Sequence, residues 1–183
     1  MRLLATTSST IILSTIIQLF SVPGYGGTPS EKWTRFPLPR GVSVELLGEV
    51  EERHSEKATP LGQVISDTLV VEIEEGWLAA TATRPPPLAL RLASDSLVLG
   101  QARRSVLGDT EGRQLGWQPV QRDGQSGMQL IFTTSKSGDV QHGVSEVFLY
   151  DQLVIALTVV LDSRSTPGPP GSVGRDSSTG NLC

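Results

Sequence analysis

Apolar and polar side chains alternate along most of the middle of the chain, and this period of two predicts β-strands. We expect strands in the segments 42–53, 69–75, 88–92, 97–99, 128–132 and 144–150. The run 153–161 is continuously apolar and rich in valine and isoleucine. A buried helix is the alternative there, but β-branched side chains favour a strand that is buried on both faces.

Residues that favour turns separate these segments. They include Asp123-Gly124, Gly138-Asp139 and three consecutive prolines at 85–87. No stretch combines a helical period with helix caps, and no repeat of fixed length occurs. Short strands with Gly and Pro turns predict an all-β domain at 36–162, an antiparallel β-sandwich or partly open barrel of about seven to nine strands.

The first 24 residues form a segment of a different kind. Arg2 is the only charged residue before Glu31, and 11–20 is the most apolar part. A short positive start, an apolar middle and a small-residue exit near Gly24 are the outline of a secretory signal. We therefore predict a signal peptide at 1–24 and a secreted or extracytoplasmic protein. A retained apolar arm or strand, and a membrane anchor or transient membrane contact, are the alternatives for this segment.

The two remaining segments outside the predicted domain are polar. Residues 25–35 are expected to be a linker, and 163–183 is a Ser-, Gly- and Pro-rich tail with almost no apolar content. Such a tail cannot bury enough surface to offset its ordering entropy, so we expect both ends of the chain to be flexible. Cys183 is the only cysteine, which makes it an unimportant tail residue, a thiol for intermolecular pairing or a free reactive thiol.

Charge and motif content narrow the classes of function. The chain has 183 residues, with 15 Lys and Arg against 19 Asp and Glu and a formal charge of −4. This balance disfavours nucleic-acid binding, which uses clustered cations. The sequence contains no phosphate-binding loop, no dinucleotide fingerprint and no paired-histidine motif. We therefore expect neither a cofactor nor a metal.

Acidic residues gather on and beside two of the predicted strands. If these strands pair, like charges would lie opposite one another and destabilise the sheet unless arginines or a hard cation compensate. A solvated outer face is the simpler interpretation, because no calcium-loop pattern accompanies the cluster. The cluster comprises Glu45, Glu49, Glu51, Glu52, Glu56, Glu72, Glu74 and Glu75.

Two further features allow either a binding role or a structural one. The proline-rich run at 84–88 is either a polyproline helix that docks into an aromatic groove or a rigid connection. Trp33, Trp77 and Trp117 either form a stacking platform for sugars or bases or anchor the core.

Ser126 lies in a Gly-x-Ser-Gly motif at 124–127. This motif resembles the nucleophile loop of chymotrypsin-like serine proteases. The alternative is that Asp-Gly followed by polar residues forms the turn of a hairpin. The resemblance implies a site with Ser126 as nucleophile, His54 as general base, Asp95 or Asp67 as the residue that orients the base, and His142 beside a specificity pocket.

Together these features predict an exported, non-enzymatic β-sandwich that binds a protein partner or associates with itself, with no catalytic residue assigned. One alternative is a self-assembling coat or appendage subunit, whose apolar N-terminal segment would pair with a neighbour's sheet edge. The other alternative is a small serine protease that uses Ser126.

Overall fold

The computed structural model describes residues 33–122, 124–136 and 139–162. The predicted signal segment, the tail with Cys183 and most of the expected linker lie outside these residues, although β1 begins inside that linker. Within the described residues the elements are β1 (Trp33–Pro37), the 3-10 helix η1 (Pro39–Gly41), β2 (Ser43–Leu47), β3 (Glu51–Thr59), β4 (Gly62–Ile73), β5 (Gly76–Arg84), α2 (Pro87–Leu92), α3 (Asp95–Asp109), β6 (Arg113–Arg122), β7 (Gln125–Lys136), β8 (Asp139–Tyr150) and β9 (Leu153–Asp162).

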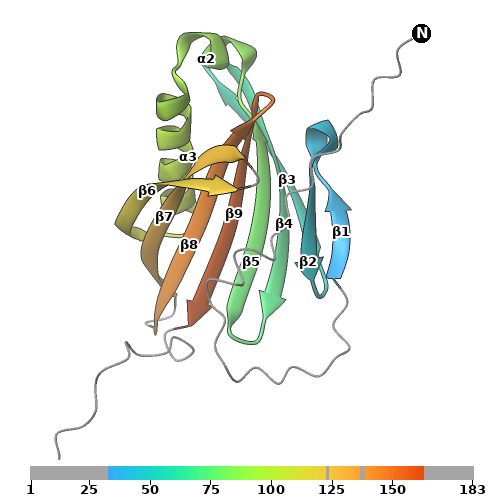
Figure 1. The fold of residues 1–183 in the computed structure, drawn as a ribbon, viewed down its shortest axis with the longest axis vertical. Coiled ribbons are helices and arrows are strands. Elements are labelled where there is room, and N and C mark those ends of the chain that lie inside the picture. The colour runs from blue at the N-terminus through green and yellow to red at the C-terminus, as the bar shows by residue number, and fades with distance from the viewer. Residues whose placement is uncertain (1–32, 123, 137–138, 163–183) are drawn as a thin grey trace, which may run out of the picture.

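These strands form two antiparallel sheets, as predicted. Seven strands make the large sheet in the order β3-β4-β5-β9-β8-β7-β6, and β1 and β2 make a separate hairpin. The chain leaves the centre of the large sheet after β5, passes through α2 and α3, and enters again at the β6 edge (Figure 1). Because β3 and β6 are not neighbours, the sheet is not a closed barrel, and the fold is a mainly β, sandwich-like arrangement.

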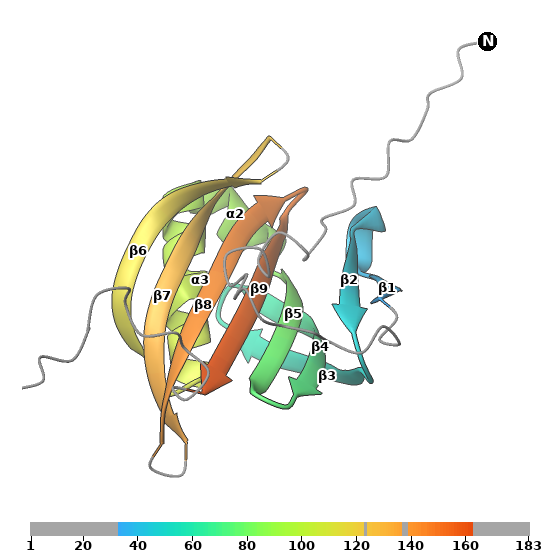
Figure 2. The same ribbon diagram turned by 60° about the horizontal axis from the view of Figure 1, so that its bottom comes forward.

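Strand β9 is buried on both faces, as its continuously apolar sequence predicts. Val154 and Ala156 pack against α3, whereas Ile155 and Leu157 belong to the core cluster shared with the hairpin. Successive side chains of a strand point to opposite faces. The hairpin and α3 therefore cover opposite faces of the large sheet, and Figure 2 shows the sheet between them.

The segment 42–53, predicted as one strand, is two strands in different sheets. Strand β2 ends at Leu47 and β3 begins at Glu51. Gly48 lies between them with φ of +98°, a left-handed conformation that glycine adopts without steric cost. This turn carries the chain from the hairpin to the large sheet, so the acidic residues on its two sides do not share a strand.

The strand predictions at 88–92 and 97–99 are wrong, because both segments are helical. The first lies in α2 and the second in α3. In α3, Val98, Ala102 and Val106 recur every four residues and pack against the sheet. That spacing is the helical signal, and the leucines at every second position imitate a strand. No helix in the described ranges is both long and apolar enough to cross a membrane.

Candidate functional site

The structure does not bring Ser126 and His54 together. His54 lies in β3 and Ser126 in β7, with four strands of the large sheet between them. At the usual spacing of neighbouring strands, this separation is roughly 24 Å. The register from His54 across the sheet reaches β7 at Gly127, so the neighbouring Ser126 lies on the opposite face. The two side chains therefore form no nucleophile–base pair.

Of the other residues implied by the protease resemblance, Asp67 is the one that meets His54. It is the direct cross-strand partner of His54 in β4. Asp95 is the first residue of α3, and His142 is exposed on β8.

The glycines of the Gly-x-Ser-Gly motif have structural roles in the β6–β7 hairpin and its neighbour β8. Gly124 has φ of +79°, in the left-handed region that the turn requires. Gly127 lies opposite Phe148, and a Cβ added there would lie 2.5 Å from the aromatic ring. Phe132 lies against Gly143 in the same way from the other strand. The hairpin interpretation explains both glycines of the motif.

The acidic residues of β3 do not face acidic residues across the sheet. Glu52 lies opposite Leu69, and Glu56 lies opposite Ile65. Both carboxylates are exposed on the edge strand. Among the residues that the structure describes, no group of three or more His, Cys, Asp or Glu side chains is arranged to hold a metal ion.

The proline run is a rigid connection between a strand and a helix. Pro85 and Pro86 follow β5, and Pro87 is the first residue of α2. Proline suits this position because the first helical N–H needs no partner within the helix and the fixed φ is already helical.

The two tryptophans whose side chains are described contribute to the core under α3. Trp77 and Trp117 are partly buried against the apolar cluster that also contacts this helix. The guanidinium of Arg103 lies over the ring of Trp117, 5.5 Å from its centroid. The side chain of Trp33 lies outside the described part of the structure.

A chain of polar side chains joins β3, β4 and β5, and we term it the His54 network. His54 lies at its centre, with Nδ1 2.7 Å from Oδ1 of Asp67 and Nε2 3.3 Å from Oε1 of Glu56. Nη2 of Arg84 donates to Oδ2 of Asp67 at 3.2 Å. At the other end, Nε2 of Gln63 donates to Oε2 of Glu56 at 2.5 Å. The network therefore begins at Arg84 and ends at Gln63.

The carboxylates of the network favour the protonated form of His54. The hydrogen bond with Asp67, followed by that with Glu56, raises the pKa of His54 above its ordinary value. In return, the hydrogen bond from His54 lowers the pKa of Asp67, and Arg84 adds to this effect. Because carboxylates lie against both ring nitrogens, the protonated form of His54 can donate a hydrogen bond to each of them, which is why its pKa is raised.

Both ends of the His54 network line a hollow of about 200 Å³ at the end of the large sheet, which we term the arginine hollow. Its polar lining residues are Arg40, Gln63, Arg84 and Gln152. Its apolar lining residues are Ile65, Pro85, Pro87, Leu90 and Leu153. The lining thus combines two cations and two amides with five apolar residues, and no carboxylate is among these lining residues.

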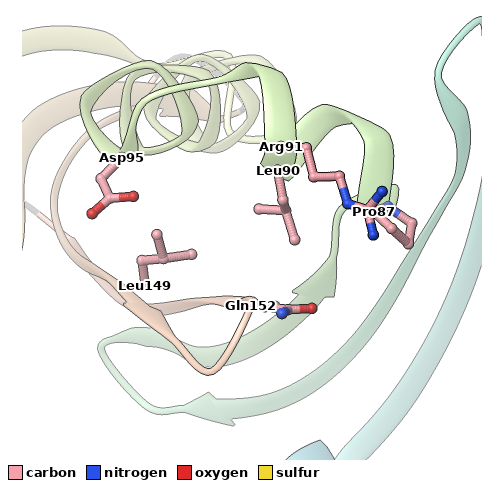
Figure 3. Close-up of a pocket in the computed structure, with 6 residues that line it drawn as sticks. All are labelled: Pro87, Leu90, Arg91, Asp95, Leu149 and Gln152. Atoms are coloured by element: carbon pink, nitrogen blue, oxygen red, sulfur yellow. The ribbon is translucent and has the colours of Figure 1, made fainter.

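A second hollow of about 300 Å³ adjoins the arginine hollow. It is lined by Pro87, Leu90, Arg91, Asp95, Leu149 and Gln152. Figure 3 shows the residues of α2 and α3 on one side of this space, with Leu149 and Gln152 on the other. Gln152 therefore contributes to both hollows, and Asp95 lies here and not beside His54.

Helix α2 also presents apolar side chains to solvent next to the hollows. Leu88 is 49% exposed and Leu92 is 71% exposed. Residues four apart lie on one side of a helix, so these two leucines form a single apolar surface, which we term the α2 leucine face. Leu97, at the start of α3, is 56% exposed.

The turn that contributes Gln152 has an unusual backbone. Asp151 has φ of +42° and Gln152 has φ of +67°, and these two residues alone connect β8 to β9. Positive φ at both positions is typical of a type I′ turn, where Asn and Gly are preferred. Arg40, 3.8 Å from Asp151, has φ of +63°. Three of the four non-glycine residues with positive φ in the described ranges therefore gather at this site.

Local sequence patterns do not single out Arg40, Gln63 or Gln152. One signal was present: only Asp151 and Gln152 separate two predicted strands, which demands a tight hairpin turn, and neither residue is glycine. Arg40 and Gln63 carry no comparable signal. They reach the arginine hollow only through the strand register and the packing of the hairpin.

A buried ion pair lies outside the lining of both hollows. Glu146 of β8 is 1% exposed, and Arg122 of β6 donates to both of its carboxylate oxygens, from Nε at 3.0 Å and from Nη2 at 2.6 Å. Gln129 of the intervening strand β7 donates to the same carboxylate at 3.1 Å. These bonds tie the edge strand β6 to the interior of the sheet.

Two solved structures resemble this chain at low identity. The solution structure of cyanobacterial PsbP (CyanoP) from Synechocystis sp. PCC 6803 is 14% identical and has a TM-score of 0.48, and the match covers 76% of this chain and 85% of that chain. The crystal structure of PA94 from Pseudomonas aeruginosa, a protein described as of unknown function, is 9% identical with a TM-score of 0.37, covering 73% and 85%. No family model and no curated protein matches this chain. Neither structural likeness assigns the chain to a family.

Proposed function

We propose that this chain is an exported, non-enzymatic module that binds a protein partner at the end of the molecule where α2 lies. The α2 leucine face is the observation that carries this proposal, because its two exposed leucines offer neighbouring apolar side chains that a partner would cover. Arginine is enriched in protein interfaces, and Arg40, Arg84 and Arg91 line the adjoining hollows. Export rests on the signal-like pattern of 1–24.

A partner on α2 is better supported than self-assembly through strand pairing. Strand β3 is charged and exposed along almost its whole length. Strand β6 has a register shift between Gln114 and Gly116, and it contains Pro119, which has no N–H to donate. Charges, bulges and prolines are the features by which sheet edges resist pairing with another chain.

The test of this surface compares two exposed leucines. Leu92 lies on the α2 leucine face, whereas Leu115, which is 54% exposed, lies on β6. We expect the tagged full chain to retain a protein from the extracytoplasmic fraction of its own cells. Leu115→Glu should retain the same protein and Leu92→Glu should lose it, because a buried charge without a partner is costly. Failure of the wild type to retain any protein, or equal retention by both variants, contradicts the proposal.

Two further measurements test the remaining parts of the proposal. N-terminal sequencing of exported protein should show a new terminus near Gly24, and exported protein with an intact Met1 contradicts the signal peptide. Sedimentation velocity of the purified chain should show a monomer at all concentrations. A dimer that Leu92→Glu dissociates would identify a second copy of the chain as the partner and would replace the proposed heterologous one.

A further inference from the structure

We infer that the arginine hollow is a carboxylate-binding pocket that takes an acidic side chain from an extended segment of the protein partner. This inference rests on the proposed function and adds the chemistry of the ligand. Arg40 and Arg84 reach the hollow from different elements, η1 and β5. Guanidinium groups bind carboxylates through paired, charge-assisted hydrogen bonds. Two such groups in a hollow that is otherwise lined mainly by apolar residues fit a carboxylate that is attached to an apolar stem.

A carboxylate outside the lining lies close to each of the two arginines, and the one beside Arg84 is hydrogen-bonded to it. Asp67 accepts a hydrogen bond from Nη2 of Arg84, and Asp151 lies 3.8 Å from Nη1 of Arg40. Within the described residues, the other N–H groups of Arg84 have no hydrogen-bond partner. These N–H groups are available to a ligand, and the hydrogen bond to Asp67 already orients the guanidinium group of Arg84. Pre-orientation of this kind lowers the entropy that binding must overcome.

The opposite end of the His54 network supports the same pocket. Glu56 holds the amide of Gln63, so the side-chain oxygen of Gln63 is left to accept a hydrogen bond. Gln152 adds a second amide between the two hollows. An amide that donates and accepts pairs well with a peptide group. These amides therefore suit the backbone of a peptide segment whose acidic side chain enters between the arginines.

The second hollow argues for an extended peptide and against a small free acid. It continues from the arginine hollow through shared lining by Pro87, Leu90 and Gln152. Its own charged residues are Arg91 and Asp95, which have opposite signs. The α2 leucine face lies on the same helix. A ligand that fills both hollows contacts Leu90, which lines each of them, and so needs apolar side chains beside its acidic one, as in a Leu-Glu-Glu-Leu segment.

The test is a titration of the full chain with acetyl-Gly-Leu-Glu-Glu-Leu-Gly-amide, followed by two-dimensional ¹⁵N NMR. We expect shifts of the Gln63 and Gln152 side-chain amides and of Nε of Arg84. The twin peptide with lysine in place of both glutamates should shift none of them. Arg84→Gln should weaken binding about tenfold or more, because it removes charge-assisted hydrogen bonds. Arg113→Gln, on the distant strand β6, is the matched control and should bind like the wild type.

Several results would overturn the inference: no shift with the acidic peptide, equal shifts with its lysine twin, or unchanged binding by Arg84→Gln. A fourth is shifts of the same groups by phosphatidylglycerol vesicles but not by the peptide, which would identify a membrane as the ligand. Failure here is distinct from failure of the proposed function. If Arg84→Gln keeps the protein partner and Leu92→Glu loses it, the α2 surface stands and only the carboxylate pocket is rejected.

Discussion

Replacement of Gln152 by glycine should stabilise the protein while weakening ligand binding. Gln152 occupies the second position of the two-residue turn between β8 and β9, with φ of +67°. A side chain in this region brings Cβ close to the following carbonyl oxygen, whereas glycine has no Cβ. The Gln152 side chain is exposed in the unbound protein, so its removal costs little packing.

The expected gain follows from two opposing terms. Relief of the left-handed conformation contributes about 1–2 kcal/mol. Glycine also gives the unfolded chain more freedom, which takes back about 0.5–1 kcal/mol. At the midpoints of these two ranges the net effect is an increase in the free energy of unfolding of about 0.75 kcal/mol. With a urea m-value of about 2 kcal/mol/M, the midpoint of denaturation should rise by about 0.4 M.

Urea denaturation followed by circular dichroism measures this change, and Gln152→Ala is the matched control. Alanine removes the same amide but keeps the Cβ, so its stability should stay close to that of the wild type. Both variants should weaken binding of the acidic peptide, because both lose the amide between the two hollows. If glycine is no more stable than alanine at this position, the turn stores no strain and the reasoning is refuted.

Three other changes test the packing and charges of the sheet. Gly127→Ala should lower the free energy of unfolding by about 1–3 kcal/mol, since its Cβ would overlap an aromatic ring; an unchanged urea midpoint contradicts this. Arg122→Leu should cost about 3–5 kcal/mol by stranding the buried carboxylate of Glu146, and adding Glu146→Leu should restore most of the loss; a double variant no better than the single one argues against an unpaired charge as the cause. Asp67→Asn should lower the pKa of His54 in an NMR titration, and no change would dismiss their hydrogen bond. The stabilisation from this pair is fully present between about pH 4 and 6.5, and it is lost as pH rises through the raised pKa of His54 or falls through the lowered pKa of Asp67.

The strands of the large sheet were predictable where burial alone determines the sequence pattern. A half-buried strand must alternate, and a central strand must be apolar on both faces. Strand β9 meets the second requirement, with residues 153–160 buried between α3 and the hairpin. The segment 42–53 was wrongly predicted as one strand because its alternation continues through Gly48. The strand ends there because of the backbone conformation of Gly48, and a hydrophobic pattern contains no information on that conformation.

The helices were not predictable from periodicity for a different reason. Helix α2 has six residues, and its leucines point in several directions: Leu90 lines both hollows, whereas Leu88 and Leu92 face solvent. Six residues make fewer than two helical turns, so the segment is too short to show an amphipathic period. The outward direction of Leu88 and Leu92 also makes α2 a candidate interface, because these exposed side chains are available to a partner.

The protease resemblance predicts that His54 pairs with Asp95 or Asp67, but it does not predict which residues surround the pair. The protease resemblance names Asp67 as one of two residues that would orient His54, and the register of β3 and β4 does pair them. In a protease, however, the second ring nitrogen would face a nucleophile, whereas here it meets Glu56, and the second oxygen of Asp67 holds Arg84. Residue types determine that a histidine and a carboxylate attract one another, but the topology determines what the pair faces. Because Asp67 also accepts a hydrogen bond from Arg84, which lines the arginine hollow, breaking the His54–Asp67 pair should change how Arg84 recognises a carboxylate. A serine-directed probe should not report this change.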